Sequence, residues 1–166
     1  MTQSDRTTND TDRIIVFLRG IGVPVCEETI PEKTFLPGIE VRDGQLLVDR
    51  ALLAYPGDLL HEAGHLAVLE PEARARACGT VEGGGAEEMA AIAWSWAALQ
   101  HIGLAPEVVF HPDGYRGGSQ SIIDNFREGH YFGVPWLAYC GLTRERPDPE
   151  SPDAAVFPQM QRWLRI

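Results

Sequence analysis

The chain has 166 residues, enough for one domain with a sizeable hydrophobic core. Its formal net charge is −10, so nucleic-acid backbones and anionic membrane surfaces are poor electrostatic partners. No apolar run is long enough to span a bilayer, and no signal-peptide core follows a basic start. The three cysteines are an odd number without C-x-x-C spacing, which argues against disulfides or a cysteine zinc site. We therefore expect a cytoplasmic protein.

The first part of the chain predicts a polar tail, a short helix and a hairpin. Residues 1–12 are rich in Thr, Asp, Ser and Asn, and we expect them to be disordered. The amphipathic pattern of residues 13–19 predicts a helix that stops at the glycines behind it. Prolines in residues 24–37 indicate an extended connector. An Asp-Gly pair between two apolar runs in residues 38–49 predicts a β-hairpin.

The most informative stretch is His61-Glu62-Ala63-Gly64-His65, which has the H-E-x-x-H pattern of zinc hydrolases. Residues four apart share one face of a helix, so His61 and His65 can bind one ion through their imidazoles. Glu62 lies beside them and can act as the base for a water on the metal. Apolar residues surround the motif, and Asp58 is a suitable N-cap for its helix. The alternative is that both histidines only form hydrogen bonds within the core.

The rest of the chain is predicted to be mainly helical. The longest periodic segment, residues 86–102, is apolar on nearly all sides and is typical of a buried helix. We expect a single domain over residues 13–142. All four tryptophans are expected to be core residues, including Trp163 of the terminal segment. Residues 143–152 have the composition of a linker, and residues 153–166 are predicted to form a terminal helix docked on the domain. Shorter helices are expected at 71–78, 119–128 and 135–139.

A catalytic zinc site needs a third protein ligand, and the long buried helix opens with two candidates, Glu87 and Glu88. At 100° per residue, Glu88 falls on the main apolar face with Ile92 and Leu99, whereas Glu87 points to another side. A carboxylate on a buried face is costly unless it meets a cation or hydrogen bonds. We therefore predict Glu88 as the third ligand. The alternative is that both acids only complement the helix dipole.

Glu88 and Ala91 form an E-x-x-A pattern, and with His61-Glu62-Ala63-Gly64-His65 they resemble the gluzincin metallopeptidases. The hairpin before the first motif and the alanine-rich second helix look most like minimal ImmA/IrrE-type zinc peptidase domains, over about residues 38–100. The resemblance implies Zn²⁺ as cofactor, Glu62 as general base and a strand that pairs with an extended peptide. Residues 39–41 or 45–48 are the candidates for that strand.

Peptide hydrolysis also needs an oxyanion donor besides the metal. We favour the glycine-flanked pair Tyr115-Arg116, because flexible loops often bring such groups over a site, and we take Tyr115 as the catalytic candidate. Taken singly, each candidate is more simply explained as a solvated or half-buried loop residue. The full set of candidates is His111, Tyr115, Arg116, His130 and Tyr131.

These observations together predict an α+β domain of the minimal zincin kind. A small sheet or hairpin would pack on the active-site helix and on a glutamate-bearing helix, and Gly64 would let the two helices approach closely. The predicted function is zinc-dependent hydrolysis of a peptide or protein substrate. The alternatives are a catalytically silent, metal-stabilised binding or regulatory module and a zinc hydrolase of a non-peptide amide. The substrate, the physiological metal and the oligomeric state stay open.

Overall fold

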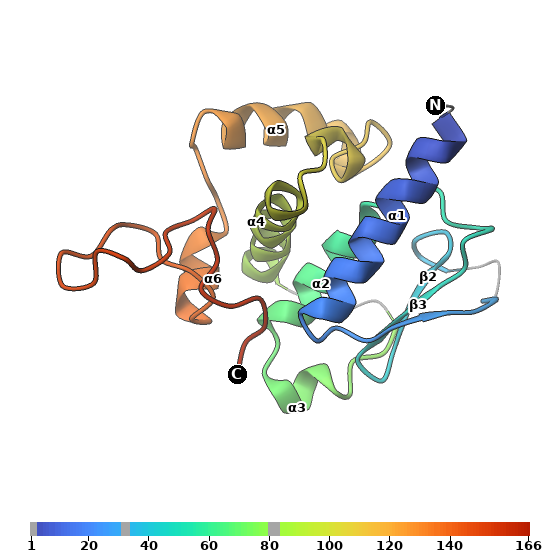
Figure 1. Cartoon of the computed structure of the whole chain (residues 1–166), viewed down its shortest axis with the longest axis horizontal. Coiled ribbons are helices and arrows are strands. Elements are labelled where there is room, and N and C mark those ends of the chain that lie inside the picture. The colour runs from blue at the N-terminus through green and yellow to red at the C-terminus, as the bar shows by residue number, and fades with distance from the viewer. Residues whose placement is uncertain (1–2, 31–33, 80–83) are drawn as a thin grey trace.

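The computed structural model of the chain describes residues 3–30, 34–79 and 84–166 (Figure 1). The fold is α+β, as predicted: a small sheet lies to one side of a group of helices. Within the described ranges, no helix is both long and apolar enough to cross a membrane. The helices other than the central two are α1 (Gln3–Gly20), α3 (Pro71–Arg74), α5 (Ser119–Arg127) and α6 (Val134–Tyr139).

The sheet has three strands in the order β1-β3-β2. The hairpin prediction is confirmed: β2 (Ile39–Arg42) pairs antiparallel with β3 (Gln45–Val48), and β1 (Val25–Glu27) adds to β3 in parallel. Asp43 and Gly44 have φ values of 48° and 72°, the left-handed pair that a tight two-residue hairpin turn requires. The connector predicted over residues 24–37 thus contains a strand, and its residues 31–33 lie outside the described part.

The position of β3 at the centre of the sheet bears on peptide binding. Its two sides are occupied by β1 and β2, so the suggestion that residues 45–48 receive a peptide is wrong. The strand β2 does lie at an edge, but the Val41 carbonyl already accepts a hydrogen bond from the Gly79 amide (2.8 Å). The Ala77 carbonyl also accepts a hydrogen bond from the Gly44 amide of the hairpin turn. The residues after Arg74 thus bond to the hairpin, and the helix predicted over residues 71–78 ends early, at Arg74.

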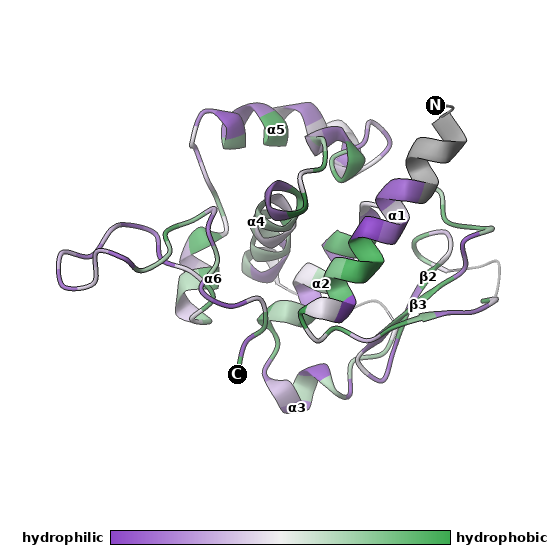
Figure 2. Cartoon of the chain, in the orientation of Figure 1, coloured by the Kyte–Doolittle hydropathy of each residue, from purple (hydrophilic) through white to green (hydrophobic). Residues whose placement is uncertain are grey.

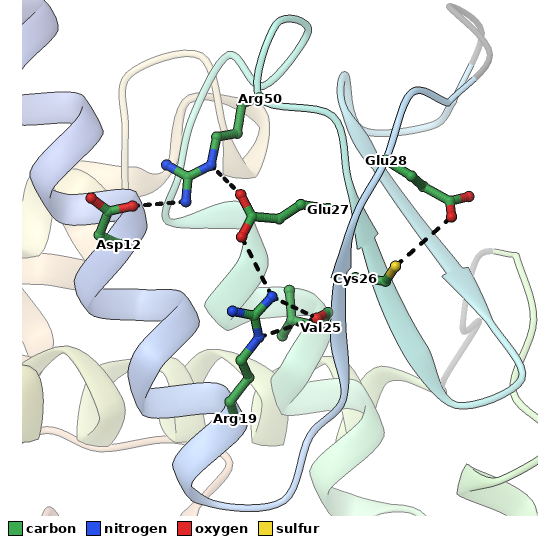
Figure 3. Close-up of polar contacts among 7 residues, drawn as sticks. All are labelled: Asp12, Arg19, Val25, Cys26, Glu27, Glu28 and Arg50. Carbon is green, nitrogen blue, oxygen red and sulfur yellow. Dashed lines mark hydrogen bonds and ion pairs between the residues drawn. The ribbon is translucent and has the colours of Figure 1, made fainter.

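Arginine side chains join α1 to the other edge of the sheet (Figure 3). Arg19 donates a hydrogen bond to the carbonyl oxygen of Val25 (2.9 Å) and pairs with Glu27 (3.4 Å). Arg50, just after β3, pairs with the same Glu27 carboxylate and with Asp12 of α1 (2.7 Å). Exposed pairs of this kind contribute about 0.2–1 kcal/mol each, so they orient β1 against α1 more than they stabilise the fold.

The centre of the molecule is the contact between α2 (Asp58–Val68) and α4 (Gly85–Ile102). A Cβ atom added to Gly64 would lie 2.9 Å from the carbonyl oxygen and 3.0 Å from the Cα atom of Ala91. The two backbones therefore touch at this point, which confirms the predicted close approach. The buried Ser95 hydroxyl donates to the Ala91 carbonyl (2.7 Å) and to the Leu60 carbonyl of α2 (3.2 Å), which links the helices further.

The prediction of a disordered N-terminal tail is wrong for residues 3–12, which are the first part of α1; residues 1–2 lie outside the described part. In Figure 2, the coloured part of α1 passes from hydrophilic residues to a hydrophobic stretch. Its polar part is held by a distant partner, because Arg13 pairs with Asp10 (3.6 Å) and donates to the Ile102 carbonyl at the end of α4 (2.5 Å). Thr11 is also buried.

The C-terminal helix predicted over residues 153–166 is also wrong, since this fully described segment consists of turns and bends. Its backbone amides donate to other parts of the chain in place of forming helical bonds: Gln161 to the Leu142 carbonyl (2.8 Å), and Arg165 to the Ala67 carbonyl of α2 (2.9 Å). The segment does dock on the domain, because the Trp163 ring packs edge-on against Trp94 at 5.5 Å. The linker predicted over residues 143–152 is irregular.

Replacing Gly64 with alanine is expected to destabilise the protein, because the added methyl group would press on the α4 backbone at Ala91. Overpacking costs about 1–3 kcal/mol, whereas exchanging glycine for alanine inside a helix gains about 1 kcal/mol. We expect a net loss of about 1 kcal/mol in the free energy of unfolding, measured with urea. Gly20→Ala is the control, because nothing lies within 4 Å of its added Cβ. Equal stability of the two variants would contradict the close contact.

Candidate metal centre

Three predicted ligands meet where the first turn of α4 passes α2. His61 and His65 lie one turn apart on α2, and their Nε2 atoms are 3.2 Å from each other. The Glu88 carboxylate comes from α4 and lies 3.5 Å from Nε2 of His61 and 3.2 Å from Nε2 of His65. Among the described residues, these three side chains form the group whose donor atoms all lie within 4.8 Å of one another.

The spacing of these donors fits a zinc ion. Ligands placed about 2.0–2.2 Å from a tetrahedral ion are about 3.3 Å apart. The two Nε2 atoms are 3.2 Å apart, and they lie 3.5 and 3.2 Å from different oxygens of Glu88, Oε1 for His61 and Oε2 for His65. Two imidazoles and one carboxylate are also a donor set found in catalytic zinc sites, where a fourth position stays open for water or substrate. The residues present therefore match zinc in both chemistry and spacing.

The protonation of the donors suits a cation as well. Burial, together with the charge of His65, lowers the pKa of His61 to about 4, so its ring is neutral near pH 7. The hydrogen bond with His65 lowers the pKa of the Glu88 carboxyl, although 47% of the Glu88 side chain is exposed. Metal binding requires a neutral imidazole and an ionised carboxylate, and both states are favoured before any metal arrives.

Glu62 lies next to His61 in the sequence but outside the ligand group. A step of 100° around the helix separates the two side chains, so Glu62 is near the centre without converging on it. The residue is buried, and this burial raises the pKa of its carboxyl to about 6, with contributions from Asp58 and Glu88. A carboxyl group with a pKa close to neutrality is suited to accept and release protons at physiological pH.

Tyr115 is the one of the five predicted oxyanion donors that contacts a predicted ligand. Its hydroxyl lies 3.3 Å from Nδ1 of His61, and the two rings meet edge to face at 5.5 Å. It opens a short 3₁₀ turn, Tyr115–Gly117, in which Tyr115 and Arg116 have φ values of 52° and 53°. Burial raises the pKa of the Tyr115 hydroxyl well above its usual value, so it stays protonated.

The other oxyanion candidates are placed elsewhere. Arg116 is exposed, and His130 is an exposed neighbour of Glu128 (3.4 Å). Tyr131 packs against Phe126 and Phe157, with ring centroids at 5.4 and 4.7 Å. These residues follow the second motif in sequence, but the contacts described for His130 and Tyr131 do not include His61, His65 or Glu88.

His111, the fifth candidate, is buried against Asp58, which corrects the expected role of that aspartate. Gly57 takes the N-cap position of α2, and the Asp58 carboxylate lies 3.1 Å from Nε2 of His111. The His111 ring also stacks on Tyr55, with centroids 3.6 Å apart and planes within 5°. Tyr55 in turn donates its hydroxyl to Asp113. The sequence carried no signal for this cluster beyond an aspartate one turn before His61.

Glu87, the alternative third ligand, faces another part of the molecule. The pKa of the Cys140 thiol is raised mainly by burial, and the Glu87 carboxylate adds to this effect, so Glu87 lies on the side of α4 near the end of α6. The structure thus separates the two acids as helical geometry suggests, with Glu88 at the histidines. Glu88 is less buried than the apolar-face argument implied.

Comparisons of the chain with models of protein families, with curated proteins and with solved structures found no match.

The first prediction of this site concerns the choice between the two acids. Glu88→Gln is expected to weaken zinc binding at least about tenfold, because it removes an ionised ligand, while the matched Glu87→Gln should bind zinc as the wild type does. Elemental analysis and competition with a chromogenic chelator measure the two effects. His61→Ala and His65→Ala are expected to lose the metal. Retention of full zinc by Glu88→Gln, with loss of zinc in Glu87→Gln, would show that Glu87 and not Glu88 is the third ligand.

The second prediction concerns the metal-free protein. The pKa of Glu62 is raised from 4.5 to about 6 in the folded state, so its favourable contribution is complete below pH 4.5 and is lost as the pH rises through 6. Glu62→Gln cannot ionise, and above pH 6 it should be more stable than the wild type by about 2 kcal/mol. Unfolding by urea in chelator, at pH 4 and pH 7.5, measures the difference.

At pH 4 we expect this advantage to disappear, because Glu62 is then protonated in both the folded and unfolded states. Glu87→Gln is the control, because it removes a carboxylate of α4 whose charge is not among those that act on Glu62. A stability difference between Glu62→Gln and the wild type that is the same at both pH values would contradict the shifted pKa.

Proposed function

We propose that this protein is a zinc-dependent hydrolase of the gluzincin type that cleaves peptide bonds. The observation that carries the proposal is the convergence of His61, His65 and Glu88 at separations suited to one zinc ion, with the buried acid Glu62 beside them. The H-E-x-x-H pattern with a glutamate from a second helix is the arrangement in which that family performs hydrolysis. The donor geometry and the sequence pattern support the same proposal.

The proposed role of each residue follows from the position of its side chain. Zinc, when bound, supplies a Lewis acid that polarises a carbonyl and lowers the pKa of water towards neutrality. His61, His65 and Glu88 hold the ion. Glu62 takes a proton from the attacking water at its carboxylate and gives it to the nitrogen of the departing amine, the two transfers that amide cleavage requires.

Access for a substrate is supported by the exposure of the ligand side chains. The Glu88 side chain is 47% exposed and that of His61 is 15% exposed, whereas that of His65 is 6% exposed. The centre is therefore open on the side of Glu88. We propose a peptide or protein as the substrate. Residues 39–41 of β2 stay the candidate edge for aligning it, although the Ile39 amide already donates to the Leu36 carbonyl (3.1 Å) and the Val41 carbonyl accepts from Gly79.

The compartment that we propose is the cytoplasm. The three cysteines are free, and two of them, Cys26 and Cys78, are exposed. Exposed free thiols are compatible with a reducing environment and are uncommon in oxidising ones. This is the remaining support for the expectation drawn from the cysteine count.

The test of the catalytic proposal is Glu62→Gln. The substitution preserves size but cannot accept a proton, so zinc content and fold should be retained while turnover falls by about 10²–10⁴-fold. A pool of fluorogenic peptides, incubated with zinc-loaded protein, provides the activity assay. The matched control is Glu87→Gln, for which we expect wild-type turnover.

The same variant distinguishes the proposal from its alternatives. Equal function of Glu62→Gln and wild type in a partner-dependent assay, with zinc bound in both, would favour a metal-stabilised binding module and contradict catalysis. Cleavage of simple amides without cleavage of peptides, abolished in Glu62→Gln, would keep the mechanism and change the substrate class.

A further inference from the structure

We propose that Tyr115 is a positioning residue of the metal centre, and that its hydroxyl accepts the Nδ1–H of His61 and so fixes the direction of the ring. This inference rests on the proposed function in one respect, since it assumes that the group His61, His65 and Glu88 binds zinc. It replaces the expectation from sequence that Tyr115 stabilises an oxyanion.

The position of the proton on His61 decides which ring nitrogen can bind a metal. A neutral imidazole carries one proton, on either Nδ1 or Nε2. Nε2 of His61 faces His65 and Glu88, at 3.2 and 3.5 Å, so it is the nitrogen that would bind the metal and must be free of its proton. The proton then belongs on Nδ1, where it needs an acceptor because the ring is largely buried.

The acceptor present at Nδ1 is the Tyr115 hydroxyl, at 3.3 Å. The edge-to-face contact of the two rings, at 90° between planes, leaves the ring of His61 little room to turn. Because Nδ1 and Nε2 lie on different edges of the imidazole, a hydroxyl bonded to Nδ1 is behind the ligand as seen from the metal. In this position it supports the ligand and does not face the open side of the ion.

Tyr115 is held in place by contacts on both sides of its turn. Tyr115 and Arg116 both have positive φ, a conformation that is unfavourable for residues other than glycine and that persists only where the surroundings enforce it. The enforcing contacts lie on either side of the turn. His111 bonds to Asp58 at 3.1 Å, and Ser119 donates its hydroxyl to the His111 carbonyl at 2.6 Å.

These contacts attach the loop directly to the helix that bears the ligands. Asp58 is in the first turn of α2, one turn before His61, so the same rigid helix carries the ligand and the anchor of the loop that supports it. Tyr55 adds two further contacts to this loop, because its ring stacks on His111 and its hydroxyl donates to Asp113. These contacts hold the strained turn where the Tyr115 ring meets the His61 ring.

The experiment compares zinc affinity in Tyr115→Phe and in Tyr139→Phe. The first variant removes only the hydroxyl at Nδ1, and the second removes a hydroxyl from an exposed tyrosine of α6. Loss of a group that orients a metal-bound histidine typically weakens metal binding about 10–100-fold. We expect a loss of at least about tenfold for Tyr115→Phe and wild-type affinity for Tyr139→Phe, measured by chelator competition.

Two further measurements separate positioning from other roles. Tyr115→Phe should lower the unfolding midpoint more in the zinc-loaded than in the metal-free protein, because the hydroxyl positions a ligand. A purely structural role would lower both midpoints equally. In ¹⁵N-histidine NMR of the zinc-loaded wild type, the Nδ1–H of His61 should exchange slowly with solvent, and this protection should be lost in Tyr115→Phe.

Zinc affinity of Tyr115→Phe within about threefold of the Tyr139→Phe control would overturn the proposal. So would unchanged affinity combined with a large fall in kcat at saturating zinc, which is the behaviour of an oxyanion donor. The proposed function is tested separately in the same series, because wild-type protein that binds no zinc, or His61→Ala that keeps it, removes the metal centre itself.

Discussion

The contact between α2 and α4 at Gly64 and Ala91 is the constraint on which the rest of the site depends. The two helices touch through their backbones there, and Ser95 adds a buried hydrogen bond across them. Helices at ordinary separation have centres about 8–10 Å apart, with side chains in between. Bringing them closer places Glu88 of one helix within 3.2 Å of His65 on the other. A larger residue at Gly64 would separate ligands that are otherwise intact.

Burial and neighbouring carboxylates disfavour the ionised form of Glu62. The groups whose charges act on Glu62 are His65, Asp58 and Glu88, and of these only His65 can carry a positive charge. Burying carboxylates together raises their pKa values and destabilises the ionised forms. A divalent ion bound between the two histidines and Glu88 would reverse that effect, since a bound cation becomes the largest local charge. The cost of ionising Glu62 in this position is therefore one that a bound cation would offset.

The parts of the fold that the sequence predicted are those encoded by neighbouring residues. The H-E-x-x-H helix, the Asp-Gly hairpin and the apolar helix α4 each follow from a local pattern, and all three are present. The errors lie where distant partners decide the structure. The N-terminal residues are helical with Arg13 bonded to Ile102, and the C-terminal segment is irregular because Arg165 bonds to Ala67. Local periodicity contains no information on either contact.

The proposed ligands follow from local sequence patterns, whereas the residues that contact their helix come from a distant segment. Spacing alone brings His61 and His65 to one face, and helical phase favours Glu88 over Glu87. Tyr115 and His111 come from an irregular loop far along the chain. The sequence named both as candidates, but no local pattern showed that Tyr115 contacts His61 or that His111 contacts Asp58. The position of Glu88 completes the arrangement. It lies in the first turn of α4, just before the buried residues begin at Ala90, where the helix dipole favours a negative charge. The Glu88 carboxylate is therefore favoured in its ionised form and is half exposed, the two properties that the proposed role requires.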